Sequence, residues 1–134
     1  MAYRTLKWDY DLYQLLIKLE KEYEKVIWLG DLNVVIYDND VLNTKCNIAG
    51  TTEEERHNIN TFINDNKWID TYHEMNKNIV KCNQRATWGV NARFPMRLDY
   101  VLCSNELKKC IVSSVVNQQF EGSDHVPMGT QFKL

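Results

Sequence analysis

The fold is decided by the stretch Val26-Ile27-Trp28-Leu29-Gly30-Asp31-Leu32-Asn33. Its run of four apolar residues predicts a strand covered on both faces, and Gly30 permits a sharp turn at the end of that strand. Asp31 then emerges at the carboxyl end of the strand, where the sites of open α/β sheets tend to lie. Because residues two apart in an extended segment point the same way, Asp31 and Asn33 can face one ligand. The alternative is an Asx-turn that only closes the strand.

Helical and extended patterns alternate on either side of this strand. Apolar residues fall at helical spacing between 9 and 23, and Thr52-Glu53-Glu54-Glu55 forms a capping box before a second apolar helical face. We expect a short strand at 68–72, further strands at 84–88, 98–103 and 111–116, and a last strand with one buried face from 126 to 134. A polar surface loop is expected from 37 to 50. Together these patterns predict an α/β or α+β domain.

The composition is that of an ordinary globular protein without a membrane segment. The 134 residues are 44% apolar and 25% charged, with a net charge of −2. This charge excludes a protein that coats nucleic acid through its global field, so binding to a polyanion must depend on a local cluster or a bound cation. There is no apolar run of membrane-spanning length and no secretory signal. The four cysteines form no C-x-x-C pair, so we expect reduced thiols in a cytosolic or nuclear protein.

Two later motifs carry groups that suit phosphate-ester chemistry, Arg97-Leu98-Asp99-Tyr100 and Gly122-Ser123-Asp124-His125. The ordinary pKa of a histidine, about 6.5, suits His125 to proton transfer or phosphate contact. Asp99 lies among apolar residues and needs a partner. It could orient His125 through one ring nitrogen, or form a structural ion pair with Arg97 or Arg85. His125 could in turn be a partly buried turn histidine.

An aromatic residue and three arginines lie between these motifs. If exposed, Trp88 could stack on a base or wedge against a sugar. The alternative is a tryptophan of the core. Arg85, Arg93 and Arg97 are the only basic cluster with an aromatic companion. They could meet phosphates or form a solvated rim.

The order and spacing of the motifs resemble those of a known family, the exonuclease III/AP endonuclease branch of the endonuclease–exonuclease–phosphatase superfamily. The resemblance runs from about residue 4 to the C-terminus and is carried by Trp8-Asp9, Trp28-Leu29-Gly30-Asp31-Leu32-Asn33-Val34, Ala49-Gly50-Thr51-Thr52-Glu53-Glu54-Glu55-Arg56, Ile69-Asp70-Thr71-Tyr72, Ala86-Thr87-Trp88, Arg97-Leu98-Asp99-Tyr100-Val101-Leu102 and Gly122-Ser123-Asp124-His125-Val126-Pro127. It implies one sheet-plus-helices half of the four-layer α/β sandwich of the DNase I-like fold. Residues 1–134 would be the C-terminal half of that domain, with the N-terminal half absent.

The resemblance also implies roles for single residues. Asp31 looks like the aspartate that activates or orients the attacking water, and Asn33 looks like its partner at the phosphate. Asp99 looks like the carboxylate that orients His125, which would contact the scissile phosphate. The implied metal-binding residues are Asp31, Asn33 and Asp124. The implied substrate-binding residues are Trp88, Arg93, Met96 and Arg97, although the segment from 88 to 97 is shorter than that branch leads us to expect.

The activity that the resemblance implies is hydrolysis of DNA at abasic sites, with Mg²⁺ or Mn²⁺, in base excision repair. We expect metal binding to be weak and the isolated chain to be inactive, because one carboxylate and one amide cannot firmly hold an ion that prefers octahedral coordination. Two alternatives remain. One is a non-catalytic half-domain with a structural or binding role, and the other is a phosphoesterase acting on RNA or phosphoinositides.

The expected partners are DNA with abasic sites and a polypeptide that covers an apolar sheet face. That polypeptide would be a second copy of the chain, a separate N-terminal half or a larger assembly, because such a face does not remain in water. The residues expected on this face include some of Val26, Trp28, Leu98, Tyr100 and Phe132. No membrane partner is expected. The expected location is intracellular, in the nucleus or cytoplasm, with the mitochondrion also open.

Overall fold

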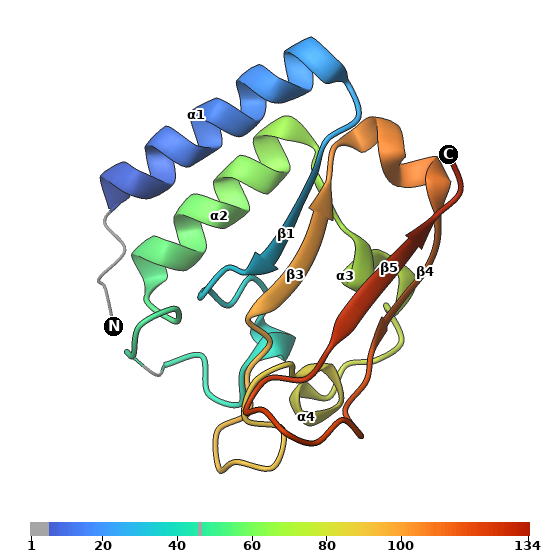
Figure 1. Cartoon of the computed structure of the whole chain (residues 1–134). Helices are drawn as coiled ribbons and strands as arrows, with labels where there is room; N and C mark the ends of the chain where they lie inside the picture. The colour runs from blue at the N-terminus through green and yellow to red at the C-terminus, as the bar shows by residue number, and fades with distance from the viewer. Residues whose placement is uncertain (1–5, 46) are drawn as a thin grey trace.

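Two long helices pack side by side over one face of a small antiparallel sheet (Figure 1). The computed structural model describes residues 6–45 and 47–134. Its elements, in chain order, are α1 Leu6–Tyr23, β1 Ile27–Asp31, the 3₁₀ helix η1 Asp38–Asp40, α2 Glu53–Asn66, β2 Ile69–Asp70, α3 Thr71–Met75, α4 Cys82–Arg85, β3 Asp99–Cys103, the 3₁₀ helix η2 Asn105–Cys110, β4 Ile111–Val116 and β5 Met128–Phe132. This arrangement confirms the mixed α/β class that the sequence predicts.

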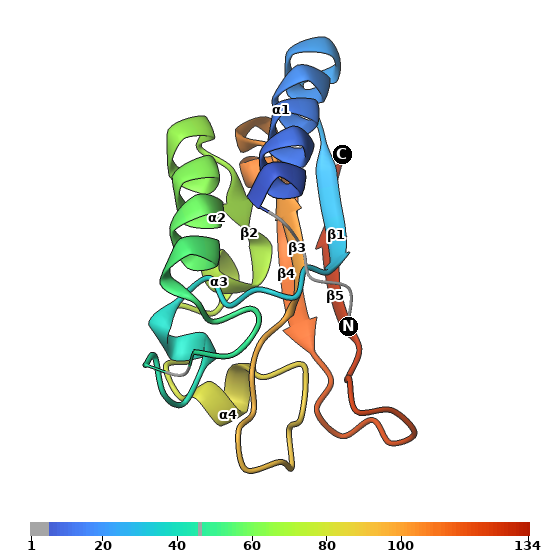
Figure 2. The ribbon, with the colours of Figure 1, turned by 90° about the vertical axis from the view of Figure 1, so that its left-hand side faces the viewer.

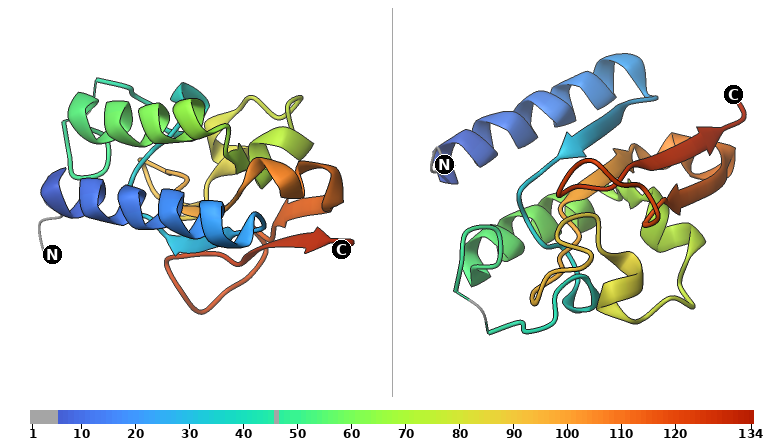
Figure 3. Two further views of the ribbon diagram at one scale, coloured as in Figure 1. Left: turned by 90° about the horizontal axis from the view of Figure 1, so that it is seen from above. Right: turned by 60° about the horizontal axis from the view of Figure 1, so that its bottom comes forward.

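The strands form two small sheets around β3. This strand pairs in antiparallel fashion with β1 on one side and with β2 on the other. In the β1–β3 register, Asp31 lies directly opposite Asp99, at the point where one strand ends and the other begins. A separate antiparallel hairpin of β4 and β5 lies beside β3, away from α1 and α2 (Figures 1 and 3).

The main core lies between the helices and the sheet, as helical periodicity requires. Tyr13 of α1 stacks on Phe62 of α2 with 4.7 Å between ring centroids, and Tyr100 of β3 is buried in the same cluster. The capping box predicted for α2 is confirmed, because the Thr52 hydroxyl accepts from the Glu55 N–H while the Glu55 carboxylate accepts from the Thr52 N–H. These contacts place α2 against the strand that carries Asp99.

Strand β1 is less covered than its apolar sequence predicts. Trp28 packs on the core, but Ile27 is 42% exposed and Leu29 is 66% exposed. The expectation of a strand covered on both faces is therefore wrong for this chain. Period-two alternation turns Trp28 toward α1 and α2 and turns Ile27 and Leu29 to the opposite face.

The bare apolar positions also differ from those expected on the open sheet face. Leu98 and Tyr100 are buried, while Val26, Trp28 and Phe132 are partly buried. Tyr100 is in the helix-covered core, and Leu98 packs with a second cluster around Val35 and Met96. The apolar side chains that β1 exposes on the open face are instead Ile27 and Leu29.

The structure corrects three expectations about secondary structure. The stretch 84–88 is not a strand, because it contains the end of α4 and then an isolated bridge between Trp88 and Met96. The strand expected at 68–72 has only two residues, since Asp70 caps the start of α3. The stretch 37–50 is not only a surface loop, because it contains η1 and the fully buried Asp40.

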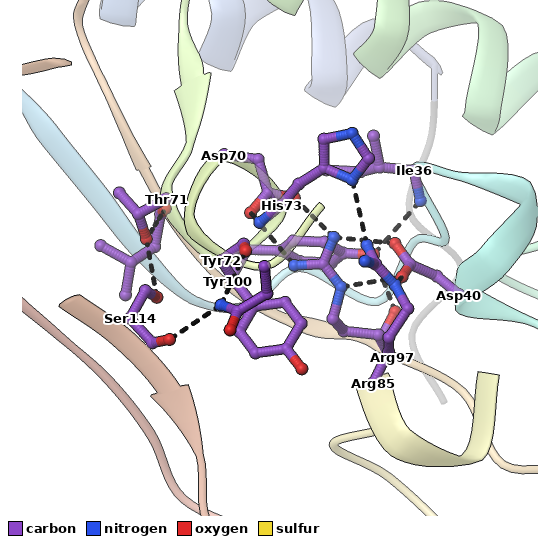
Figure 4. A network of polar contacts seen from close by, with 12 residues as sticks. Ile36, Asp40, Asp70, Thr71, Tyr72, His73, Arg85, Arg97, Tyr100 and Ser114 are labelled. Carbon is purple, nitrogen blue, oxygen red and sulfur yellow. Dashed lines mark hydrogen bonds and ion pairs between the residues drawn. The ribbon is translucent and has the colours of Figure 1, made fainter. Parts of the chain in front are cut away.

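Asp40 is buried because it belongs to an ion network that joins η1, β2, α4 and the start of β3 (Figure 4). Its Oδ1 accepts from Arg85 Nε at 2.6 Å and from Arg97 Nε at 3.0 Å, and its Oδ2 accepts from Arg97 Nη2 at 2.8 Å. Asp70 accepts two further bonds from Arg97, at 2.5 and 3.1 Å. Burial alone would lower the pKa of Arg97, but Asp70 and Asp40 outweigh it, so that pKa is raised.

The described cysteines are thiols, as the sequence predicts. Cys82, Cys103 and Cys110 are free thiols, whereas Cys46 is outside the described residues. Burial raises the pKa of Cys82 to about 11, which keeps its thiol protonated at neutral pH. Within the described ranges, none of the helices has the length and apolar character needed to cross a membrane.

Candidate functional site

The candidate site forms where three distant segments meet at one end of the sheet. Asp31 ends β1, Asp99 begins β3, and His125 lies in the loop that leads into β5. Strand pairing brings Asp31 and Asp99 together, and a backbone bridge between Trp88 and His125 attaches the third segment. The loops after α4 and after β4 project from this same end of the molecule (Figure 2).

His125 lies between two carboxylates. Its Nδ1 is 2.8 Å from Asp99 Oδ2, which is hydrogen-bond distance, and its Nε2 is 3.8 Å from Asp31 Oδ2. The predicted Asp99–His125 contact is therefore confirmed, and the alternative partners Arg97 and Arg85 pair with Asp40 and Asp70 instead. The His125 side chain is 31% exposed, so the ring can meet a ligand as well as its two carboxylates.

The surroundings of His125 favour its charged form. Burial on its own would lower the pKa of His125, but the hydrogen bond to Asp99 and the negative charges of Asp99, Asp31 and Asp124 outweigh that effect. The pKa is therefore raised above the ordinary value of about 6.5. A larger share of this imidazole carries a proton at neutral pH than in a free histidine.

Asp31 and Asn33 do not share an extended segment. Asp31 Oδ1 accepts a hydrogen bond from the Asn33 N–H at 3.0 Å, and Asn33 has a left-handed φ of 49°. The local geometry is thus the Asx-turn, which was the alternative to two side chains on one extended face. Asp31 still faces His125 with its other oxygen, while Asn33 is exposed beside it.

Gly50 holds the Asn33 turn in place from the other side. A Cβ on Gly50 would lie 2.6 Å from the Asn33 carbonyl oxygen, and Gly50 itself has a φ of +86°. The Gly50 carbonyl also accepts from the Val35 N–H at 2.7 Å. Only glycine allows this approach without strain, so the turn that follows Asp31 depends on it.

Asp124 points to the rim of the site and not to His125. Its Oδ2 accepts from the Trp88 indole N–H at 3.1 Å, and its carbonyl accepts from the Gly89 N–H at 2.9 Å. Trp88 is half-buried against the Met96 cluster, so it is partly a core residue and partly a surface one. A cavity of about 180 Å³ adjoins Asp124 and is lined mainly by 89–92 and by Gln118 and Phe120.

The expected metal-binding residues do not form a complete cation site on their own. Asp31 faces His125, and Asp124 accepts a hydrogen bond from the Trp88 indole N–H. Asn33 donates its backbone N–H to Asp31 within the Asx-turn. Across residues 6–45 and 47–134, no three histidine, cysteine or acidic side chains converge as metal ligands. A hard divalent cation would need further oxygen ligands from elsewhere.

The four expected substrate-binding residues fall in different environments. Arg93 is exposed on the 89–94 loop with its guanidinium over the Phe94 ring, and Trp88 is at the rim of the site. Met96 is buried in the second core cluster. Arg97 has no exposed surface and is paired with two carboxylates, so it is a structural residue and not the substrate contact that the sequence predicted.

Sequence reasoning missed one residue, Thr87, that bonds to the two segments carrying Asp99 and His125. The Thr87 hydroxyl oxygen accepts from the Leu98 and Asp99 N–H groups, and its carbonyl accepts from the Val126 N–H. Nothing in the tripeptide Ala86-Thr87-Trp88 signals this position. The buried carboxylates Asp40 and Asp70 were missed as well, because the sequence offered Asp99 as the partner of Arg97 or Arg85.

Comparisons with known proteins agree with this geometry. A model of the Endonuclease/Exonuclease/phosphatase family matches residues 1–125. A DNA-(apurinic or apyrimidinic site) endonuclease of Dictyostelium discoideum is 34% identical over all of this chain and 38% of that protein. An exodeoxyribonuclease of Bacillus subtilis (strain 168) is 27% identical over 92% of this chain and 50% of that protein. The chain thus spans half or less of the length of these curated relatives.

Two solved structures share the fold. The AP endonuclease LMAP from Leishmania major superposes with a TM-score of 0.81 at 24% identity, covering 98% of this chain and 44% of that one. The 3′ phosphatase NExo from Neisseria, bound to a product DNA hairpin, gives 0.83 at 16% identity, covering 96% of this chain and 52% of that one. At these identities the two structures speak for the fold alone.

Proposed function

Because the chain belongs to the Endonuclease/Exonuclease/phosphatase family, and within it to the AP endonuclease/exonuclease III group, we propose that it carries one wall of an active site for phosphodiester hydrolysis at abasic sites in DNA. The observation that carries this proposal is the row Asp99–His125–Asp31. A second polypeptide segment, equivalent to the N-terminal half of the relatives, would supply the opposite wall.

The row suits attack of water on a phosphate. The 3.8 Å between His125 Nε2 and Asp31 Oδ2 is too long for a hydrogen bond, so both atoms keep a hydrogen-bonding site for a phosphoryl oxygen or a water that approaches them from solvent. The His125 imidazolium would donate to a non-bridging oxygen and stabilise the charge that develops there. Asp31 would take the proton of the water as its oxygen bonds to phosphorus and the bond to the leaving sugar oxygen breaks.

Metal dependence is proposed for the completed domain only. Asp31, Asn33 and Asp124 of this chain would contribute oxygen ligands to Mg²⁺ or Mn²⁺, but they do not complete a site without further residues. The steps derived above therefore use only side chains of this chain. DNA contacts are proposed for Trp88 at the rim and for Arg93 on the exposed loop beside it.

A non-catalytic half-domain is the second candidate function. It is favoured by the incomplete ligand set among the described residues. The pairing of Asp99 with His125 favours the catalytic proposal instead, since the imidazole is partly exposed and has a carboxylate near each ring nitrogen. A phosphoesterase acting on RNA or phosphoinositides has no observation in its favour here.

The test is incision of a labelled DNA duplex that contains one abasic site. We expect little incision by the chain alone. Incision should appear when magnesium and a polypeptide covering the N-terminal part of the Dictyostelium relative are added. His125→Ala and Asp31→Ala should each lower that rate by a factor of about 10² or more. The exposed Lys7→Ala, in the first turn of α1, is the matched control and should leave the rate unchanged.

Each other outcome has a distinct meaning. Incision that survives both His125→Ala and Asp31→Ala would come from a contaminating nuclease and would refute the assigned residues. No incision in any mixture, although the two parts associate, would favour the non-catalytic half-domain. Parallel substrates with the abasic site in RNA, and a phosphoinositide, separate the phosphodiesterase classes.

A further inference from the structure

Thr87 lies inside the molecule between the two segments that carry the catalytic pair. It is fully buried, one residue before Trp88 and two after Arg85. Its hydroxyl oxygen is 3.0 Å from the backbone nitrogens of both Leu98 and Asp99. Both are backbone donors at the start of β3, and the Thr87 hydroxyl oxygen accepts from both of them.

The backbone of Thr87 holds the other segment. Its carbonyl accepts from the Val126 N–H at 2.8 Å, immediately after His125, while its N–H donates to the Met96 carbonyl at 3.0 Å. The next residue, Trp88, forms a backbone bridge with His125. One residue therefore fixes the main chain of Asp99 through its side chain and the main chain next to His125 through its carbonyl.

The buried ion network that Figure 4 draws fixes residues close to Thr87 in the chain. Asp40 binds Arg85, two residues before Thr87, and Arg97, two residues before Asp99. The segment that carries Arg85 and Thr87 is thus joined to the segment that carries Arg97 and Asp99 at two points, through Asp40 and through the Thr87 hydroxyl. Because Thr87 and Arg85 are fully buried, solvent cannot replace a hydrogen bond lost at the Thr87 hydroxyl.

From this placement we propose that Thr87 is a positioning residue, whose hydroxyl oxygen holds Asp99 at hydrogen-bond distance from His125. The role rests on the proposed function, because it matters for catalysis only if His125 acts on a phosphate. Thr87 touches no substrate atom in this scheme and acts entirely through Asp99. Without its hydroxyl, the start of β3 loses two acceptor contacts and Asp99 is free to move from the ring.

The test compares Thr87→Val with Thr87→Ser in the intact chain. Valine keeps the β-branched shape and all backbone bonds but removes the acceptor, whereas serine keeps the acceptor. The measurement is the NMR titration of the histidine ring protons, which is simple because the chain has three histidines. We expect the pKa of His125 to fall in Thr87→Val and to stay near the wild-type value in Thr87→Ser.

His73 provides an internal control, because it contacts Arg85 and Tyr37 and does not touch Thr87. A folded Thr87→Val protein with unchanged titration of both His125 and His73 would overturn the proposal. If Thr87→Val does not fold, Thr87→Cys replaces it, since a thiol is a weak acceptor of similar size. An unchanged His125 titration in Thr87→Cys would then overturn the proposal in the same way.

The titration requires no catalysis, so it can fail or succeed independently of the proposed function. A lowered His125 pKa together with no incision by any form of the protein would support the positioning role and count against the nuclease. If the completed domain does cleave DNA, Thr87→Val should lower kcat by about 10² with little change in KM, and Thr87→Ser should restore it.

Discussion

At the scale of single residues, the charge on one imidazole depends on the carboxylate beside it. Asp99 accepts from His125 at 2.8 Å, and this bond together with the negative charges of Asp99, Asp31 and Asp124 outweighs the effect of burial on the pKa of the ring. The same contact therefore sets both the protonation of the candidate catalytic group and part of the stability of the fold. A single substitution at Asp99 tests both.

We predict that Asp99→Asn lowers the pKa of His125, because burial then acts with less opposition. The folded-state pKa of His125 is raised above its unfolded value, so the stability it contributes is fully present below about pH 6.5 and is lost as the pH rises through the raised pKa. The loss of unfolding free energy in Asp99→Asn should therefore be larger at about pH 6 than at about pH 9. Urea unfolding at both values measures it.

The exposed His57 gives the control for this prediction. His57→Gln should change the unfolding free energy little at either pH. An equal loss in Asp99→Asn at both values would show that Asp99 acts as a neutral hydrogen-bond acceptor only. In the completed domain, incision should fall as the pH is raised. The fall should begin at a lower pH for Asp99→Asn than for the wild type, because the lower pKa makes the imidazolium of the variant lose its proton at a lower pH.

Residue identity alone predicted some of these roles and not others. The Asp99–His125 pair could be inferred because a carboxylate in a core strand needs a partner and a histidine needs an orienting group. The same logic offered Arg97 as an alternative partner, and only the structure shows that Arg97 is taken by Asp40 and Asp70. The left-handed turn at Asn33 and the acceptor role of Thr87 depend on backbone geometry that no residue type specifies.

At the scale of elements, local signals were reliable where one element is stabilised by its own sequence. The helix α2 begins at its capping box and buries the face that periodicity predicts, and β4 follows its β-branched run. The stretch 84–88 was misassigned, because its conformation is set by contacts from far along the chain. Burial of Asp40 has the same origin.

We predict that Asp40→Asn destabilises the protein by about 3–5 kcal/mol, because it leaves the buried Arg85 and Arg97 without one of their charge partners. The measurement is urea unfolding followed by circular dichroism. The exposed pair Lys7–Asp11 is the matched control, and Asp11→Asn should cost about 1 kcal/mol or less. Equal losses in the two variants would contradict the idea that burial makes the Asp40 network critical.

At the scale of the whole molecule, β1 is an edge strand with an uncovered apolar face. Among residues 6–45 and 47–134 it pairs only with β3, and Ile27 and Leu29 are both largely exposed. Edge strands of this kind are usually protected from pairing with another chain by charged side chains or by another element that covers them. The expectation of a covering polypeptide therefore stays a prediction, with its residues now specified.

We predict that the chain associates as its concentration rises, because two apolar side chains beside an unpaired strand edge favour contact with a second surface. Size-exclusion chromatography with light scattering measures this. Leu29→Lys should shift the protein toward monomer, whereas Val80→Lys, at an exposed position between α3 and α4, should have no effect. A monomer at micromolar concentration would contradict the prediction.

The pairing of β1 with β3 also sets the order in which the chain can fold. Asp31 and Asp99 are opposite each other in the ladder although about 70 residues separate them, whereas β4 and β5 pair across a short connection. Closing the longer loop costs more chain entropy, so the hairpin can form early and the β1–β3 ladder late. Any ligand that bridges Asp31 and His125 therefore binds only the fully folded chain, and its binding free energy adds directly to the stability of that state.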